Sequence, residues 1–159
     1  MNAKAGLIAT GLLFAAVTGV QQSSAASASH IDVRGGWQAD LYTLKDGTQY
    51  PVRGQILFTE KDWSVLFFVM KDGAAQRGSG EGGSYKLKGD QIVLRHRYHV
   101  VVAAPELPSL KAQPEQVRIV PEDDAKRDEP AIITIADDKL TINFGPSGNH
   151  MSFIRSSAP

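Results

Sequence analysis

The 159-residue chain contains no cysteine. This absence excludes a disulfide framework, a thiol nucleophile, a thiolate metal site and a lipid anchor attached through cysteine. Neither sign of charge is in excess, since 17 basic residues balance 17 acidic ones. A neutral chain exerts no long-range attraction on nucleic acid or on anionic membranes, so we expect neither as a partner.

The chain also lacks an apolar run of the roughly 20 residues that a membrane helix needs. Its apolar run at residues 7–20 follows Lys4 and precedes a small-residue segment with Ala26-Ser27-Ala28. This order is typical of a signal peptide, with an uncleaved anchor or a buried helix as the alternatives. We expect a signal peptide at residues 1–28, one domain at residues 29–159, a periplasmic or secreted location, and no membrane insertion after cleavage.

No convincing amphipathic helix is present either, and the mature chain instead alternates between apolar and polar residues with period two. Turn signals recur roughly every ten residues, as in all-β barrels and sandwiches. The expected strands cover residues 37–42, 52–60, 63–71, 84–88, 91–102, 116–120, 131–136, 139–144 and 150–155. The pattern therefore predicts an all-β domain of eight or nine short antiparallel strands.

One hairpin organises the middle of the chain. Gly89-Asp90 separates two alternating runs, and glycine adopts the positive φ that a two-residue hairpin turn requires. The preceding segment at residues 72–83 is rich in glycine, carries no phosphate-binding motif, and is expected to be a flexible loop at the mouth of the fold. The charged segment at residues 121–130 is expected to be a solvated loop.

Three short motifs are similar to those of lipocalins and related calycins. Gly35-Gly36-Trp37 matches the Gly-x-Trp of their first strand, and Arg155 matches the arginine of their last strand. The hairpin at residues 82–90 resembles that of bacterial lipocalin-like domains. The resemblance implies an antiparallel up-and-down β-barrel of about eight strands. Closure of such a barrel makes the first and last strands neighbours, so Trp37 and Arg155 are expected to stack as a structural pair.

The candidate site lies in the second arm of the hairpin. If alternation is unbroken, one face carries Ile92, Leu94, His96, Tyr98, Val100 and Val102, and the other carries Val93, Arg95, Arg97, His99 and Val101. The first face is more apolar and is assigned to the interior. His96 could then transfer protons and Tyr98 could donate a hydrogen bond to a ligand. The alternatives are a satisfied core histidine and a tyrosine that reaches the rim; a reversed register would turn both arginines inward, towards a carboxylate ligand.

We expect no metal and no other cofactor. His96 and His99 form an H-x-x-H pair, but residues three apart on a strand point to opposite faces unless a bulge intervenes. The carboxylates that could lie near His96 are those of Asp40, Glu60 and Glu81, where salt bridging is the expected role.

The remaining candidates are aromatic walls. Trp63, Phe67 and Tyr85 are assigned to the interior, and residues 63–71 are apolar on both faces, which favours an apolar cavity. The leading hypothesis is an exported protein that binds a small, mostly apolar molecule. One alternative is a barrel isomerase, cyclase or hydrolase that uses His96, and another is an envelope interaction or inhibitor module with a packed barrel. The sequence indicates no particular oligomeric state.

Overall fold

The computed structural model describes residues 31–124 and 127–156, and within them the chain forms strands and no helix. The expected signal peptide lies outside this part of the chain. No helix of the described residues is long and apolar enough to cross a membrane. The strands are β1 (Gly35–Thr43), β2 (Gln49–Phe58), β3 (Asp62–Lys71), β4 (Ala74–Lys88), β5 (Gln91–Val102), β6 (Gln116–Ile119), β7 (Asp128–Ala136), β8 (Lys139–Phe144) and β9 (Asn149–Arg155).

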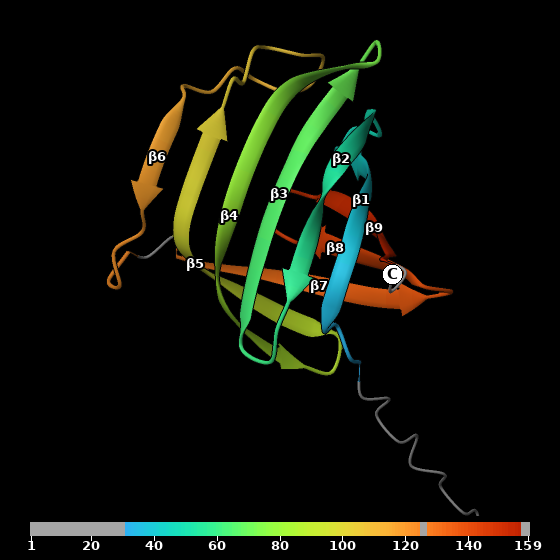
Figure 1. The fold of residues 1–159 in the computed structure, drawn as a ribbon, viewed down its shortest axis with the longest axis vertical. Helices are drawn as coiled ribbons and strands as arrows, with labels where there is room; N and C mark the ends of the chain where they lie inside the picture. Colours follow the sequence, from blue (N-terminus) through green and yellow to red (C-terminus); the bar gives the residue numbers. More distant parts are fainter. Residues whose placement is uncertain (1–30, 125–126, 157–159) are drawn as a thin grey trace, which may run out of the picture.

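Eight of these strands close into a barrel. Strands β1 to β5 pair in chain order, β5 continues through β7, β8 and β9, and β9 returns to β1. Every pairing is antiparallel, and Figure 1 shows the strands wrapping around a common interior. The expected all-β, antiparallel up-and-down barrel of about eight strands is confirmed, in the closed form that the resemblance to lipocalins implies.

Strand β6 lies outside this ring. The first half of β5 pairs with β7, from Gln91 opposite Ile132 to Arg95 opposite Asp128. The second half of β5 pairs instead with β6, from Tyr98 to Val101. Figure 1 shows β6 beside β5 at the margin of the barrel. The wall therefore changes partner in the middle of β5, next to the candidate site.

Trp37 anchors the seam between the first and last strands. Its side chain is fully buried, it lies opposite Arg155 in the β1–β9 ladder, and the Arg155 guanidinium sits 4.0 Å from the centre of its ring. The indole N–H donates a hydrogen bond of 2.7 Å to the carbonyl of Val33. A stacked guanidinium gains cation–π energy while its own donors stay free for hydrogen bonds. The expected stacking of Arg155 on Trp37 is therefore present.

The glycine-rich segment is a strand rather than the expected loop. Strand β4 pairs along one edge with the whole of β3 and along its other edge with β5. It is the longest strand of the barrel. A Cβ at Gly78 would lie 3.1 Å from the Phe68 ring, and a Cβ at Gly82 would collide with the Tyr98 hydroxyl. Large side chains from both neighbouring strands thus lie across the bare backbone of β4, and this close approach explains the glycines better than flexibility does.

Strand β3 shows how both of its apolar faces are used. Trp63, Val65 and Val69 are buried in the interior. On the opposite face, Phe68 is half-buried over glycine and Leu66 is half-exposed. The expectation that this strand faces interior space on one side and packing on the other is therefore confirmed for Phe68, while Leu66 is only partly covered.

Candidate functional site

A β-bulge in β5 sets the geometry of the site. Gly82 of β4 lies opposite Tyr98, but the next residue, Gly83, lies opposite His96, so Arg97 is an extra residue in the ladder. A bulge of this kind reverses the alternation of faces beyond it. The consequence is visible in the burial of the last two residues, because Val101 is 4% exposed and Val102 is 54% exposed. The face expected from unbroken alternation is wrong from Tyr98 onward.

Tyr98 is therefore not an interior residue. It is 37% exposed, and its side chain crosses the outer side of Gly82. Its expected role as a hydrogen-bond donor to a ligand in the lumen is incorrect, because the bulge turns it outward. His99 was assigned to the outer face, and the same bulge turns it inward, towards Glu81.

The two arginines of β5 remain on the outside, where they form ion pairs. The Arg95 guanidinium bonds both carboxylate oxygens of Asp128 at 2.7 Å, and Arg97 contacts Asp62 at 3.3 Å. The first partner, Asp128, belongs to the charged segment at residues 121–130. The reversed register, which would have placed both arginines inside, is wrong.

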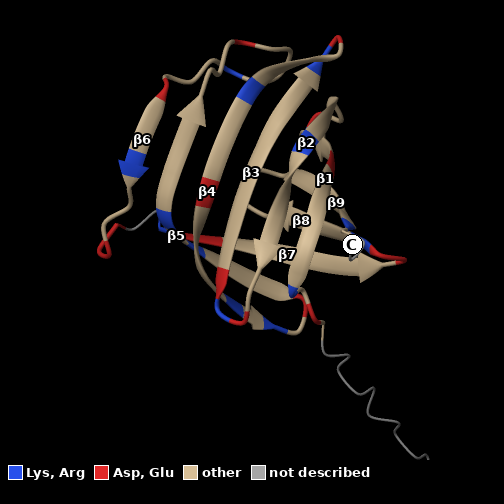
Figure 2. Cartoon of the chain, in the orientation of Figure 1, with Lys and Arg blue, Asp and Glu red and all other residues tan. Residues whose placement is uncertain are grey.

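Glu81 is the centre of the inward-facing polar cluster. One of its oxygens lies 3.2 Å from His96 Nδ1, and the other lies 3.3 Å from His99 Nε2. The hydroxyl of Ser79 donates to that second oxygen at 3.1 Å. On the far side of the imidazole, His96 Nε2 lies 3.2 Å from Glu129 Oε2. His96 is thus held between two carboxylates, one from β4 and one from β7, and Figure 2 shows acidic positions on both of these strands.

This arrangement decides the charge of His96. The side chain is only 12% exposed, and burial alone would lower the pKa of its imidazole. Hydrogen bonds to Glu129 and Glu81, together with the charges of both carboxylates, act in the opposite direction and raise the pKa to about 9. His96 is therefore an imidazolium at neutral pH, donating from both ring nitrogens.

Glu81 responds in the complementary way. Burial raises the pKa of its carboxyl, but the hydrogen bond from His96 and the charge of His99 outweigh burial, and the pKa is lowered overall. The carboxylate is thus ionised and paired. Two negative charges and one imidazolium meet where the barrel wall separates two pockets.

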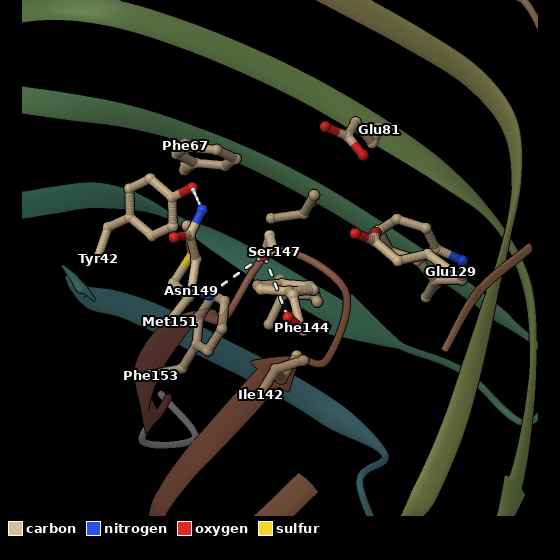
Figure 3. Close-up of a pocket in the computed structure, with 13 residues that line it drawn as sticks. Tyr42, Phe67, Glu81, Glu129, Ile142, Phe144, Ser147, Asn149, Met151 and Phe153 are labelled. Atoms are coloured by element: carbon tan, nitrogen blue, oxygen red, sulfur yellow. Dashed lines mark hydrogen bonds between the residues drawn. The ribbon is translucent and has the colours of Figure 1, made fainter. Parts of the chain in front are cut away.

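The first pocket is the barrel lumen, with a cavity volume of about 240 Å³ (Figure 3). Most of its walls are apolar. Its lining comprises Tyr42, Ile56, Trp63, Val65, Phe67, Glu81, Glu129, Ile142, Phe144, Ser147, Asn149, Met151 and Phe153. Figure 3 shows the Tyr42 hydroxyl and the Asn149 amide meeting at one side, where Asn149 Nδ2 donates at 2.9 Å, and the two glutamates at the other.

The second pocket lies outside the lumen and is open, with a volume of about 470 Å³. Its lining includes all four members of the cluster, Glu81, His96, His99 and Glu129, together with Arg118 of β6. Because both glutamates line both pockets, the two pockets adjoin at the cluster.

Trp63 connects the cluster to the lumen. Its ring meets that of His96 edge to face, with centroids 5.1 Å apart and planes at 90°. Its Nε1 atom is buried and, among the described residues, has no hydrogen-bond partner. Nearly all buried polar groups in proteins are satisfied, so an unpartnered donor beside a cavity needs an explanation.

The other aromatic candidates divide. Phe67 lines the lumen, as expected. Tyr85 is not part of that lining; its ring packs against Phe58 at 5.3 Å and its hydroxyl donates to the Thr59 carbonyl at 2.9 Å. The expected place of Tyr85 in the ligand pocket is therefore wrong, because its ring packs on the core residue Phe58 outside the lining of the lumen.

Sequence reasoning identified Glu81 and missed Glu129. Asp40, the other candidate carboxylate with a described partner, bonds Lys139 instead of His96. Glu129 belongs to a segment expected to be a loop, yet it lies in β7 opposite Leu94, two positions before His96 on β5. Nothing in the local pattern indicates this pairing, because it depends on β5 pairing with β7 along its first half and with β6 along its second half.

Comparison with known proteins finds little that is similar. No protein-family model matches the chain, and no curated protein matches it. A crystal structure of a lipocalin-like protein from Bacteroides uniformis is 18% identical over 77% of this chain and 97% of that one, with a TM-score of 0.46. An uncharacterized protein from Bacteroides eggerthii is 16% identical over 79% of this chain and 100% of that one, with a TM-score of 0.48. The function must therefore be inferred from the side chains of this chain.

Proposed function

We propose that this protein is exported and binds a small, mostly apolar organic molecule in the lumen of its barrel. Support for the apolar character comes from the walls, whose side chains are chiefly aliphatic and aromatic. Support for the size comes from the volume of about 240 Å³. An apolar cavity of about 150 Å³ is enough for benzene, so a ligand somewhat larger than one ring fits this lumen. The proposal of export rests on the pattern of residues 1–28.

The unpartnered N–H of Trp63 is the observation that carries the proposal. Trp63 lines the lumen, and its buried Nε1 finds no acceptor among the described residues. Leaving a buried donor unsatisfied costs about 1–3 kcal/mol, which a bound molecule with a hydrogen-bond acceptor would recover. The ligand class is therefore an apolar body that carries at least one acceptor oxygen or nitrogen.

Native mass spectrometry of protein purified from its own cell envelope, followed by organic extraction, tests the proposal. We expect a bound small molecule that is released by extraction. The isolated ligand should then bind Trp63→Phe about tenfold more weakly, because the ring remains while the N–H is lost. If nothing co-purifies and no lipophilic fluorescent probe binds, the proposal fails.

A matched pair of variants tests the location of binding. Val65 lines the lumen and is 8% exposed, whereas Val117 on β6 is 84% exposed. Val65→Phe fills part of the lumen and should reduce probe binding, while Val117→Phe adds the same ring to the surface and should leave probe binding unchanged. Equal probe affinity in both variants would place the binding site elsewhere.

A second candidate function is catalysis, and the Glu81–His96–Glu129 cluster is the observation that favours it. A strongly shifted pKa beside a cavity is common at catalytic sites. Because His96 is protonated at neutral pH, it suits proton donation or stabilisation of a developing negative charge, rather than proton abstraction. A barrel isomerase, cyclase or hydrolase of a small organic substrate fits this role. Turnover that persists in His96→Ala would exclude His96 from such a reaction.

The third hypothesis, an interaction or inhibitor module with a solidly packed barrel, loses its structural premise. Its barrel would be filled with side chains, whereas this lumen is open over about 240 Å³. Loop-mediated binding therefore receives no support from the interior of the barrel.

A further inference from the structure

The second pocket, called the outer pocket from here on, brings together side chains of the types that bind transition metals. Glu81 on β4, His96 and His99 on β5, and Glu129 on β7 all line it. On an unbroken strand His96 and His99 would point to opposite sides, but the bulge at Arg97 turns both towards Glu81. The geometric objection to a metal site in an H-x-x-H strand pair is thereby removed.

Three of these side chains are already close enough to share one ion. Single donor atoms of Glu81, His96 and Glu129 all lie within 4.8 Å of one another. With metal–ligand bonds of about 2.0–2.2 Å, donor atoms around one ion are separated by up to roughly 4 Å, so small side-chain rotations bring these three into range. Glu129 has the freedom for such a rotation, since its side chain is 38% exposed.

We propose that Glu81, His96 and Glu129 bind one divalent transition-metal cation, such as Zn²⁺, at the base of the outer pocket. His99 and Ser79 then act on the metal through Glu81, because both contact its second oxygen and fix the orientation of its carboxylate. The pocket is open on its outer side, so a coordination position remains for water or a small ligand. This inference concerns the outer pocket and does not depend on a molecule in the lumen.

The mixture of ligands selects the class of cation. One imidazole and two carboxylates suit Zn²⁺, Mn²⁺, Fe²⁺ or Co²⁺, whereas Ca²⁺ and Mg²⁺ prefer oxygen ligands alone. The charges also match, because a divalent cation balances the two carboxylates, and it would take the place of the proton that His96 now shares between them. Discrimination between zinc and calcium is therefore a direct test of whether His96 is a ligand.

Calorimetric titration of the purified, untagged protein with zinc chloride tests the proposal. We expect one ion per chain with a dissociation constant in the micromolar range or below, and at least about tenfold weaker binding in His96→Gln and in Glu129→Gln. His150→Gln is the matched control: it also removes one histidine, but this residue lies on β9, opposite Thr43 and Asn143, and lines neither pocket. Titration with cobalt chloride should develop the visible absorption of a protein-bound Co²⁺ ion.

Several results would overturn the metal site. Absence of stoichiometric zinc binding to the unmodified protein does so without reference to any variant, even if one of them fails to fold. Equal weakening in His150→Gln, or calcium binding as tight as zinc binding, would also contradict it. Glu129→Gln is the variant most certain to fold, since its side chain lies at the rim, and an unchanged zinc affinity in this variant would remove Glu129 from the site.

Discussion

The barrel contains two pairs of a tryptophan and a cationic side chain, and they differ in what surrounds them. At the β1–β9 seam, Arg155 stacks on Trp37, whose N–H is bonded to Val33. In the wall between β3 and β5, protonated His96 meets Trp63 edge to face, and the N–H of Trp63 has no partner among the described residues. Neither member of the first pair lines the lumen or the outer pocket, whereas Trp63 lines the lumen and His96 lines the outer pocket.

The difference separates an element that stabilises the fold from one that is arranged for binding. Every polar group of the Trp37 side chain is satisfied internally, so nothing at the seam calls for a ligand. In the second pair, the N–H of Trp63 has no acceptor among the described residues, and the imidazole of His96 contacts two carboxylates. An unsatisfied buried donor is a cost in stability, and a strongly shifted pKa beside a cavity is typical of functional sites.

Replacing each tryptophan gives the largest expected contrast. Trp37→Ala should reduce the free energy of unfolding by about 3–5 kcal/mol, because it removes a fully buried indole and leaves a cavity under Arg155. Urea denaturation followed by circular dichroism measures the loss.

The matching change in the other pair is milder. Trp63→Phe keeps an aromatic ring, leaves a smaller gap than alanine would, and removes a donor that has no partner among the described residues, so the protein should lose clearly less than the loss of about 3–5 kcal/mol expected for Trp37→Ala. A loss as large as that of Trp37→Ala would mean that Trp63 is also primarily structural.

The next largest effect is the pH dependence of His96. Its pKa is about 9 in the folded protein, above the unfolded value of 6.5. A raised pKa stabilises the fold fully below pH 6.5, and this contribution is lost as the pH rises through 9. Between pH 6 and pH 9.5 we expect a loss of about 2 kcal/mol, measured by denaturation in the presence of EDTA.

His96→Gln supplies the control for this measurement, because glutamine does not titrate. Its unfolding free energy should fall less than that of the unmodified protein over the same range, and parallel curves would contradict the assignment. Glu81 acts at acidic pH. Because its pKa is lowered, the carboxylate stabilises the fold fully above pH 4.5, the ordinary pKa of a glutamate, and this contribution is lost on acidification.

Arg155→Met examines the structural pair with a smaller change. Methionine keeps much of the apolar contact with Trp37 but loses the charge over the ring and the contact with Asp138 at 3.4 Å. Because the arginine side chain is 37% exposed, we expect a loss of about 1 kcal/mol in urea denaturation. A loss above about 3 kcal/mol would show that the guanidinium closes the barrel by itself.

The smallest effect belongs to the outer face of the strand that carries His96. Arg95 and Asp128 form a bidentate pair, but both side chains are more than 40% exposed. Arg95→Gln should therefore cost less than about 1 kcal/mol and should leave both zinc and probe binding unchanged. A change in either binding measurement would show that the two faces of β5 are coupled.

Much of the fold could be predicted from local patterns. The hairpin turn at Gly89-Asp90 and the alternating runs around it depend on neighbouring residues alone, and each expected strand is present, although β4 and β7 begin earlier than predicted. The segment at residues 72–83 could not be predicted, because its glycines serve side chains of other strands. Phe68 and Leu66 arrive from β3 and Tyr98 from β5, and only the folded barrel brings them to the same surface.

The candidate site was predictable only in part. His96 and Glu81 were identified, since a histidine on the apolar face of a strand needs a polar partner. The bulge at Arg97 was not predictable, because a single unpaired residue leaves no mark on composition, and it inverted the assignments of Tyr98 and His99. The position of Glu129 beside His96 could not be predicted, because it requires β5 to exchange its partner from β7 to β6 along its length, and such pairing between distant strands is a tertiary property.

That exchange has a consequence for the timescale of access. Within the described residues β6 pairs with β5 alone, over four residue pairs, and Val117 and Ile119 on it are largely exposed. A strand held so lightly opens locally at a small fraction of the free energy needed to unfold the ring. Its Arg118 forms part of the outer pocket, so each such opening also removes one wall of that pocket. The exposure of the polar cluster then varies with how often β6 detaches, a kinetic property that amide hydrogen exchange measures directly.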